Sequence, residues 1–182
     1  MAPLVAFVER LRRERGLGAE VPNFDPWDGG VAAELLFVLE APGPKTVASG
    51  FVSRNNPDAS ASTFYAANME AGIPRRLTVT WNIVPWALAD ARGRVRAPAP
   101  RDLGAGIPYL EQLLSLLPRL RAVVLVGRKA ECAAPRLAAG WPHVARFTAP
   151  HPSPQFVNRR PENRERLVEA LRVVAAGVAS GR

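Results

Sequence analysis

Three polar residues stand where hydrolytic chemistry could take place: Glu40, Asn82 and His151. Glu40 ends the apolar run ELLFVLE, Asn82 lies in the run LTVTWNIV, and His151 lies between two prolines in APHPSPQ. A carboxylate can polarise a water molecule, an amide offers both a donor and an acceptor, and an imidazole can stabilise negative charge on a leaving group. Glu40 could instead cap a surface turn, and His151 could serve only to bond a backbone carbonyl.

Short apolar segments that alternate with helical patterns must position these residues. Strands are predicted at 35–39, 77–84, 122–126 and 143–148, and helices at 4–15, 61–71, 105–117, 129–139 and 161–176. This alternation predicts an α/β fold, a three-layer αβα arrangement with a central four-stranded parallel sheet. The carboxyl ends of parallel strands share one edge of the sheet, so Glu40, Asn82, Gly127 and the segment after Thr148 should meet there.

The connecting segments are predicted to be irregular. Residues 41–58 should form one long loop, because the sequence APGP at its start is expected neither to extend a strand nor to begin a regular helix. Long loops in compact domains are usually functional or disordered. Asp58 or Ser60 should cap the helix that follows. Residues 87–104 should form an exposed basic loop up to the start of the next helix.

The charge balance points to a polyanionic partner. The 182 residues include 24 Lys plus Arg against 16 Asp plus Glu, which gives a net charge of +8 and a pI near 11.1. Such proteins most often bind nucleic acid. The alternative is the arginine-rich codon usage of a high-GC genome, since Ala, Arg, Pro and Gly are all abundant. Basic segments at 92–101 and 159–166 could follow DNA phosphates or could form an ordinary solvated surface.

Cysteine content and hydropathy limit the cofactors and the compartment. Cys132 is the only cysteine in the sequence. This excludes an internal disulfide, a thiolate zinc site and a cysteine-ligated iron–sulfur cluster, so we expect no metal and no other cofactor. Without a membrane-length apolar run or a signal-peptide core, the chain is expected to be cytoplasmic and to have no membrane partner. Its length predicts one domain, residues 1–182.

Four motifs occur in an order that resembles the uracil-DNA glycosylase superfamily. They are LEAPG at 39–43, Gly-Phe at 50–51, TWNIVPW at 80–86 and HPSPQ at 151–155. The resemblance covers about residues 35–172, and HPSP is its more specific motif. EAPG is similar to the motif of the thermophile-type branch. The resemblance implies a parallel sheet flanked by helices, which agrees with the fold predicted from the alternation of elements.

The resemblance also implies a role for each matching residue. Glu40 is similar to the acid that orients or activates the attacking water. His151 is similar to the histidine that hydrogen-bonds the base carbonyl as the base leaves. Phe51 resembles the aromatic residue that stacks on the flipped base, and Asn82 resembles the asparagine that reads the pyrimidine edge.

The HPSPQ segment is expected to bind DNA. Ser153, with the flanking Pro152 and Pro154, resembles the loop that pinches a DNA phosphate. Gln155 occupies the position where relatives often place a wedge residue, commonly leucine. Because glutamine departs from that pattern, the neighbouring Phe156 could be the wedge instead.

Two other departures from the superfamily pattern indicate a divergent branch. Leu39 replaces the glycine that usually precedes the acid of EAPG, which could tighten the pocket. The cysteines that hold an iron–sulfur cluster in the thermophile-type branch are missing, so that cofactor should be absent. The range of accepted bases is therefore expected to extend beyond uracil.

The predicted activity is that of a monofunctional DNA glycosylase, which hydrolyses the bond between deoxyribose and uracil or a related deaminated base. This is the first step of base excision repair. Bond cleavage builds positive charge on the sugar and negative charge on the base. Glu40 should stabilise the first charge, whereas neutral His151 and backbone amides near Ala41 and Gly43 should stabilise the second.

The partner should be DNA with the damaged base flipped out, bound by a monomer that associates with the bacterial nucleoid. Two alternatives remain open from the sequence. One is a catalytically silent DNA-binding or damage-sensing protein on the same fold, against which the retained Glu40, Asn82 and His151 argue. The other is a hydrolase of free nucleosides or nucleotides, which would not need an extended basic surface.

Overall fold

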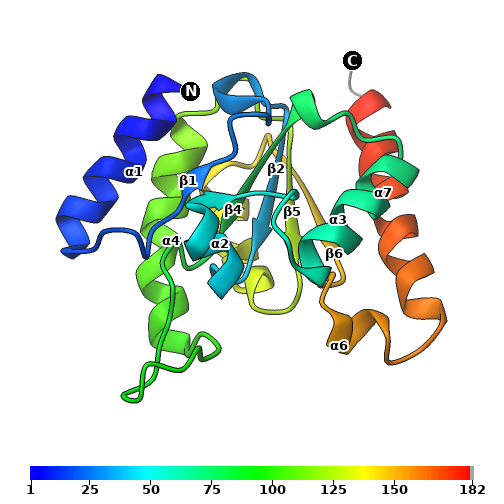
Figure 1. Ribbon diagram of the computed structural model, residues 1–182. Helices are drawn as coiled ribbons and strands as arrows, with labels where there is room; N and C mark the ends of the chain where they lie inside the picture. Colours follow the sequence, from blue (N-terminus) through cyan, green and yellow to red (C-terminus); the bar gives the residue numbers. More distant parts are fainter. Residues whose placement is uncertain (181–182) are drawn as a thin grey trace.

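A four-stranded parallel sheet forms the centre of the computed structural model, which describes residues 1–180 (Figure 1). The strand order is β4-β2-β5-β6. The bounds of these strands are Thr78–Asn82 for β4, Leu35–Leu39 for β2, Ala122–Val126 for β5 and Ala145–Ala149 for β6. All three pairings are parallel, so the four carboxyl ends lie along one edge of the sheet.

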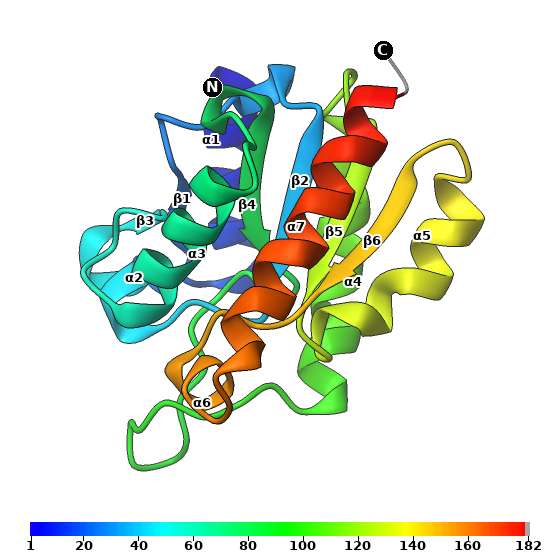
Figure 2. The ribbon, with the colours of Figure 1, turned by 90° about the vertical axis from the view of Figure 1, so that its right-hand side faces the viewer.

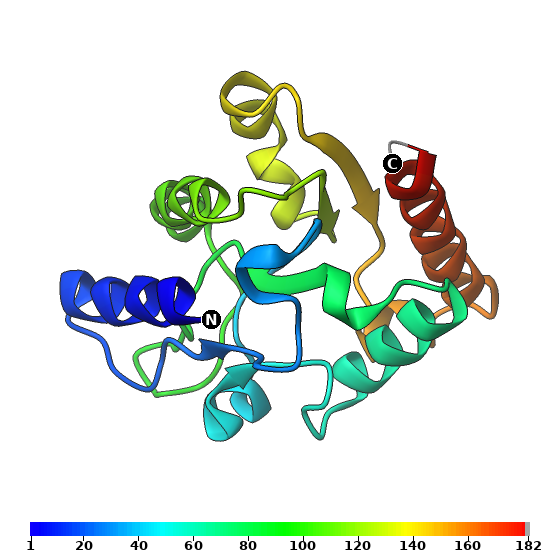
Figure 3. The ribbon, with the colours of Figure 1, turned by 90° about the horizontal axis from the view of Figure 1, so that it is seen from above.

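Helices cover both faces of this sheet, which gives the three layers expected from the sequence (Figures 2 and 3). On one face lie α1 (Ala2–Arg15), α4 (Pro100–Ser115) and α5 (Ala134–Gly140), packed on strand residues such as Leu36. On the other face lie α3 (Ala59–Glu70) and α7 (Glu162–Ser180), packed on residues such as Phe37. Successive strand residues point to opposite faces, so each strand contributes to both cores. The predicted three-layer αβα fold is confirmed.

The segment 41–58 corrects one prediction. It is not a continuous loop, because it contains the helix α2 (Pro44–Ser49) and the short strand β3 (Phe51–Val52). Pro44 occupies the first helical position, where a missing N–H is tolerated and the fixed φ of proline suits the helix. Gly50, with a φ of 76°, ends α2 in the left-handed conformation. The expectation that no helix could begin at this turn was therefore wrong.

Several shorter elements were also not predicted. The strand β1 (Asn23–Phe24) pairs with β3 in a separate two-stranded parallel sheet. Short 3-10 turns occupy Gly30–Ala32 and Arg75–Leu77, and α6 spans Pro154–Val157. The helix predicted at 129–139 is divided into a 3-10 turn at Ala130–Ala133 and α5. The predicted basic loop 87–104 ends early, because α4 begins at Pro100 and Asp102 accepts a hydrogen bond from the Ala99 N–H at 2.8 Å.

The start of α3 decides between the two predicted caps. Asp58 is the N-cap, and its carboxylate accepts a hydrogen bond from the Ala61 N–H at 2.9 Å. This bond satisfies one of the free amides at the start of the helix.

Within residues 1–180, no helix combines the length and the apolar character that crossing a membrane requires.

A buried ionic cluster ties the segment before α3 to the sheet. Arg54 Nη2 donates to Asp28 Oδ1 at 3.0 Å and to Thr78 Oγ1 at 2.6 Å, and Arg75 Nε donates to Asp28 at 2.9 Å. Arg75 also pairs with Asp25. Burial raises the pKa of Asp28, although the charge of Arg54 opposes this shift. Charges this deeply buried need such partners, so the cluster fixes the position of Arg54.

Replacing Asp28 by alanine should destabilise the fold, because Arg54 would stay buried without its carboxylate. Removing one member of a buried ion pair typically lowers the free energy of unfolding by about 3–5 kcal/mol. The measurement is urea-induced unfolding followed by circular dichroism. The control is Asp90→Ala, which removes the partner of Arg94 on an exposed loop and should leave the midpoint nearly unchanged. Equal midpoints for the two variants would show that the cluster contributes little.

Candidate active site

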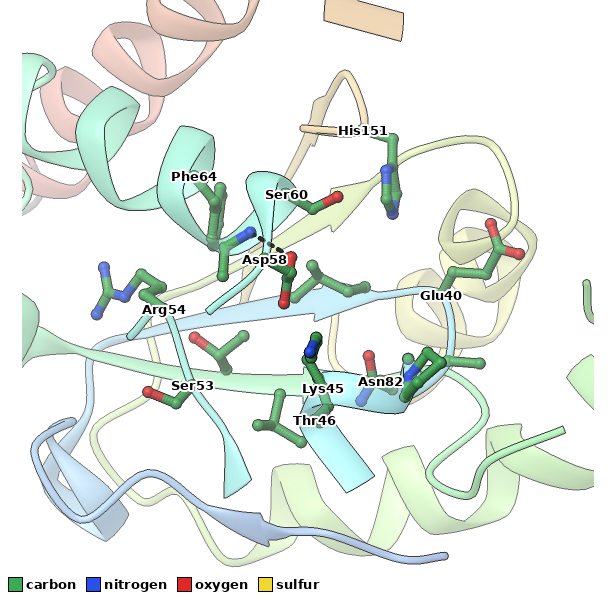
Figure 4. Close-up of a pocket in the computed structure, with 17 residues that line it drawn as sticks. Glu40, Lys45, Thr46, Ser53, Arg54, Asp58, Ser60, Phe64, Asn82 and His151 are labelled. Carbon is green, nitrogen blue, oxygen red and sulfur yellow. Dashed lines mark hydrogen bonds between the residues drawn. The ribbon is translucent and has the colours of Figure 1, made fainter. Parts of the chain in front are cut away.

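A cavity of about 320 Å³ lies at the carboxyl ends of β2 and β4, on the face that α3 covers (Figure 4). Glu40, Asn82 and His151, the three residues singled out from the sequence, all line it. Phe64 from α3 and Arg54 from the segment between β3 and α3 line other parts of its wall. The structure therefore brings together polar groups that are distant in sequence.

Parallel strand pairing produces this convergence. In the register between β2 and β4, Leu39 pairs with Asn82, and Glu40 is the first residue after β2. The pairing continues past the strand ends, since the Ile83 N–H donates to the Leu39 carbonyl at 2.8 Å. On the other side of the sheet, β6 ends at Ala149, two residues before His151. Asn82 at the end of β4, and Glu40 and His151 just beyond the ends of β2 and β6, therefore lie along one sheet edge.

His151 is arranged as a neutral hydrogen-bond donor. The Ser153 N–H donates to His151 Nδ1 at 3.2 Å, so the neutral ring carries its proton on Nε2. Burial lowers the pKa of His151, and the negative charge of Glu40 opposes this shift without cancelling it. Figure 4 shows the ring directed into the cavity. An imidazole in this state can donate to a group that becomes negatively charged.

Gly127 allows the ring of His151 to take this position. It follows β5 with a φ of 84°, and its N–H donates to the Ala149 carbonyl at 2.8 Å. A Cβ atom at Gly127 would lie 3.0 Å from the His151 Cβ and 3.3 Å from its Cδ2. The sequence placed Gly127 at this sheet edge but did not show that it contacts the histidine.

Asn82 presents a polar side chain with free hydrogen-bonding capacity. The residue is 4% exposed, and its Nδ2 has no hydrogen-bond partner within residues 1–180. An unpartnered buried amide is unfavourable in the empty pocket, so a ligand that accepts its hydrogen bond would remove that penalty. This is the behaviour expected of a residue that reads the edge of a base.

Glu40 lies where this cavity meets a larger groove. Four residues line both spaces: Glu40, Ala41, Gly43 and His151. Glu40 therefore lies at the junction of the two spaces, together with His151.

Phe51 lies outside the cavity. The residue is 38% exposed and borders a separate apolar pocket beside Leu4 and Phe24, whereas the next residue, Val52, lines the cavity. The aromatic residue in the cavity wall is Phe64, which the sequence did not single out. Consecutive residues of a strand point to opposite sides, which explains why Val52 rather than Phe51 faces the cavity.

Residues 26–175 match the family model described as the Uracil DNA glycosylase superfamily. The chain belongs to this superfamily. Its members act on DNA as glycosylases, so membership supports a uracil-DNA glycosylase-like function with DNA as the partner. No curated protein sequence matches the chain.

Two solved structures of low sequence identity share the fold. The crystal structure of wild-type SMUG2 from Pedobacter heparinus is similar with a TM-score of 0.56 and 12% identity, over 99% of this chain and 85% of that chain. The solution structure of a provisionally named uracil DNA glycosylase from Methanosarcina acetivorans gives a TM-score of 0.51 at 12% identity, over 79% of this chain and 92% of that chain. Both similarities support the three-layer architecture of the superfamily.

The segment expected to bind DNA borders the larger groove. Ser153, Gln155 and Phe156 line it, whereas Pro152 is buried and Pro154 begins α6. The structure thus places both candidate wedge residues, Gln155 and Phe156, on the groove beside the cavity.

Basic side chains border the same groove: Arg96, Arg128, Lys129, Arg159 and Arg166. Two of them brace the loop before α4, because Arg96 forms a two-pronged ion pair with Asp102 and Lys129 Nζ donates to the Pro98 carbonyl at 2.9 Å. The Arg96 guanidinium lowers the pKa of Asp102 to about 2.

The residues of this superfamily member do not suit the iron–sulfur cluster of the thermophile-type branch. A cluster needs several thiolates, and Cys132 is the only cysteine in the sequence. In the part of the chain that the structure describes, no group of three or more His, Cys, Asp or Glu side chains could hold a metal ion.

The pKa of His151 should lie below the ordinary histidine value of about 6.5, because burial disfavours the charged ring. Glu40→Gln should lower this pKa further, since the carboxylate charge favours imidazolium. The measurement is a pH titration of the imidazole protons by NMR, with His151→Ala to assign the signal against that of His143. An unchanged pKa in Glu40→Gln would show that the carboxylate does not act on the ring.

Proposed function

We propose that the chain is a monofunctional DNA glycosylase that hydrolyses the N-glycosidic bond of uracil or a related deaminated base in DNA, the first step of base excision repair. The observation that carries this proposal is the neutral His151, whose Nδ1 is occupied by the Ser153 N–H, in a cavity shared with Glu40 and the unpartnered Asn82. The superfamily membership supports the same reaction class.

The mechanism divides two developing charges between two residues. As the bond between C1′ and the base nitrogen breaks, the electron pair moves to the base and the sugar takes on oxocarbenium character. The His151 Nε2–H stabilises the negative charge on the base, as a preorganised donor in an oxyanion-type site does. The Glu40 carboxylate stabilises the positive sugar and orients the water that adds to C1′. The water supplies the hydroxyl of the sugar product and, in net terms, the proton of the free base.

Base recognition requires that the nucleotide leave the helical stack. The extruded base would lie between Leu39 and Phe64, which both line the cavity, and would bond the Asn82 amide. We assign the aromatic contact to Phe64 rather than Phe51, because Phe51 borders a different pocket. Backbone amides near Ala41 and Gly43 would contact the base from the mouth of the cavity.

The groove beside the cavity would bind the DNA strand. Ser153, between Pro152 and Pro154, is proposed to hold a phosphate, and Gln155 or Phe156 would fill the space that the extruded base leaves. Each step uses groups of one chain and no metal or other cofactor, so we propose that the protein acts as a monomer. Its substrate would be nucleoid DNA in the cytoplasm.

Glu40→Gln and His151→Ala should each slow base excision while DNA binding is retained. The loss of one preorganised donor typically reduces the rate by about 10²–10³, and we expect at least a tenfold loss, about 1.4 kcal/mol, for either variant. Single-turnover excision of uracil from an oligonucleotide, with the protein in excess, isolates the chemical step.

Asn82→Ala should weaken binding of DNA that carries the damaged base more than binding of plain duplex.

Matched controls are available at exposed positions. Glu9→Gln and His143→Ala make the same chemical changes at residues that do not line the cavity, and both should excise at the parent rate. If Glu40→Gln and His151→Ala also excise at the parent rate, the assigned roles are incorrect. A parent protein that binds DNA but excises no base from any substrate would favour the silent DNA-binding alternative.

Arg128→Ala and Arg159→Ala should each lower the affinity for DNA. Each should also make that affinity depend less steeply on the salt concentration. Both side chains border the groove, and within residues 1–180 neither forms an ion pair or a side-chain hydrogen bond, so both are free to contact phosphates. Each lost phosphate contact should reduce the slope of log K against log salt by about 1. Fluorescence anisotropy at several salt concentrations measures this slope.

The control for this experiment is Arg13→Ala, which removes the same charge from an exposed position on α1, away from the groove. It should leave the slope close to the parent value. If all three arginine variants reduce the slope equally, binding follows total charge rather than the groove.

A further inference from the structure

A hairpin projects from the same edge of the sheet as the cavity. We call its residues, 88–96, the hairpin arm. Ala89 and Val95 form an antiparallel bridge, and the Arg96 N–H donates to the Leu88 carbonyl at 3.1 Å. Figures 1 and 2 show this green segment extending beyond the carboxyl edge of the sheet. The arm is therefore a folded feature of the surface.

The carboxylate of Asp90 organises the tip of the arm. Its Oδ1 accepts hydrogen bonds from the Arg92 N–H at 2.8 Å and the Arg94 N–H at 2.9 Å, and its Oδ2 accepts one from Arg94 Nε at 2.9 Å. Gly93 turns the chain with a φ of 74°, in the left-handed region that favours glycine. A tip that is already held in one conformation loses little conformational entropy when it meets a partner.

The base of the arm is fixed to the body of the protein. Leu88 is 6% exposed and belongs to the hydrophobic core, and the Ala87 N–H donates to the Glu20 carbonyl at 2.8 Å. At the other end of the arm, Arg96 is held by its ion pair with Asp102. The arm therefore presents its tip at a defined place beside the groove.

The tip exposes two arginines and an apolar side chain. Within residues 1–180, the Arg92 side chain has no hydrogen-bond or ion-pair partner, and the Arg94 side chain bonds only Asp90. Val95 is 63% exposed and lines the groove. Proteins that bind the minor groove of DNA combine arginine or lysine with apolar side chains that they insert between base steps. The tip of the arm carries the same combination.

The arm and α6 border one groove. The groove measures about 1460 Å³ against about 320 Å³ for the cavity, and its lining includes Val95 of the arm as well as Gln155 and Phe156 of α6. Figure 1 shows the arm and α6 as two separate projections beyond the sheet edge. In the proposed function, the strand that carries the damaged base lies against α6. The arm is then in a position to contact a second strand.

We propose that the hairpin arm contacts the strand opposite the damaged base and makes duplex DNA the preferred substrate. This inference rests on the proposed glycosylase function and extends it to the choice between single-stranded and duplex DNA. Arg92 and Arg94 contact phosphates of the complementary strand, and Val95 packs against the same strand. A single-stranded oligonucleotide contacts the cavity and α6 but leaves the arm in solvent.

The test replaces residues 90–94 by Gly-Gly, which joins Ala89 to Val95 through a two-residue turn of the kind that closes hairpins. Single-turnover excision is measured on a uracil oligonucleotide as a single strand and as a duplex with guanine opposite the uracil, because a mismatched base costs less to extrude. For the parent, the protein concentration that gives half the maximal rate should be at least roughly fivefold lower on duplex, since each additional phosphate contact releases counterions. Shortening the arm should remove most of this advantage and leave the single-strand value unchanged.

Point variants separate the two kinds of contact. Arg92→Ala should reduce the slope of log K against log salt by about 1 on duplex and leave the slope on single strands unchanged. Val95→Ser should weaken duplex binding without changing the slope, because it removes an apolar contact and no charge. Fluorescence anisotropy with uracil-free oligonucleotides measures both effects, and these two variants decide the inference if the shortened protein does not fold.

The matched charge control is Arg13→Ala, at an exposed position on α1. The shortened arm loses one Asp and two Arg, so its net charge falls by one, as it does in Arg13→Ala. The duplex advantage should therefore survive in Arg13→Ala if it comes from the arm.

A parent protein that excises uracil without preferring duplex would overturn the inference and leave the proposed function intact. Equal losses on single-stranded and duplex DNA in the shortened variant, or an equal loss of the duplex advantage in Arg13→Ala, would also overturn it. If the parent excises no base, the proposed function fails, and the anisotropy measurements alone decide the inference. Duplex binding that is weakened by shortening the arm, with single-strand binding retained, would support it, and equal binding of the two forms by the parent would overturn it.

Discussion

The parallel pairing of β2 with β4 and β5 is the constraint on which the site depends. Backbone hydrogen bonds fix Leu39 beside Asn82, and the same pairing continues past the strand ends to hold Glu40. Because β5 also pairs with β6, the loop that carries His151 reaches the same edge. A parallel sheet thus brings together the residues of the proposed active site from segments that are distant in sequence, and the buried strands supply the rigidity that a preorganised site requires.

The buried cluster around Arg54 extends this rigidity to the deep end of the cavity. Arg54 reaches Asp28 and Thr78 through one nitrogen, and Thr78 lies on β4, two residues before Thr80. The cluster therefore connects the segment before α3 to the strand that carries Thr80 and Asn82. An ionic cluster of this kind is weak support for overall stability. Its structural consequence is to hold a donor at a fixed place in a cavity whose wall also includes the apolar side chains of Leu39, Val52 and Phe64.

The sequence was sufficient to predict the sheet and the residues at its edge. The runs at 35–39 and 122–126 match β2 and β5, because a strand that is covered on both faces is continuously apolar. The convergence of Glu40, Asn82 and His151 followed from parallel topology alone. The separate strands β1 and β3 were missed because two residues carry no periodic pattern.

Other features were not predicted, one because a local rule was misapplied and the rest because they depend on distant parts of the chain. The turn at 41–44 was expected to exclude a helix, although Pro44 is compatible with the first turn of α2. A motif placed an aromatic residue near the site, but the direction of Phe51 depends on the pairing of β3 with β1. The burial of Arg54 depends on Asp28, which is 26 residues away in sequence, and no local pattern indicates that pair.

The protonation of His151 links the fold to the proposed chemistry. A charged imidazolium would attract the departing base strongly, but burial of the ring disfavours the charge, and the pKa of His151 falls despite the nearby Glu40. The Ser153 N–H then fixes the proton on Nε2, where the ring faces the cavity. In the proposed mechanism the neutral ring would act on the base, and the Glu40 carboxylate would act on the sugar. Their separate positions along one sheet edge are what would let the two residues address different parts of the substrate.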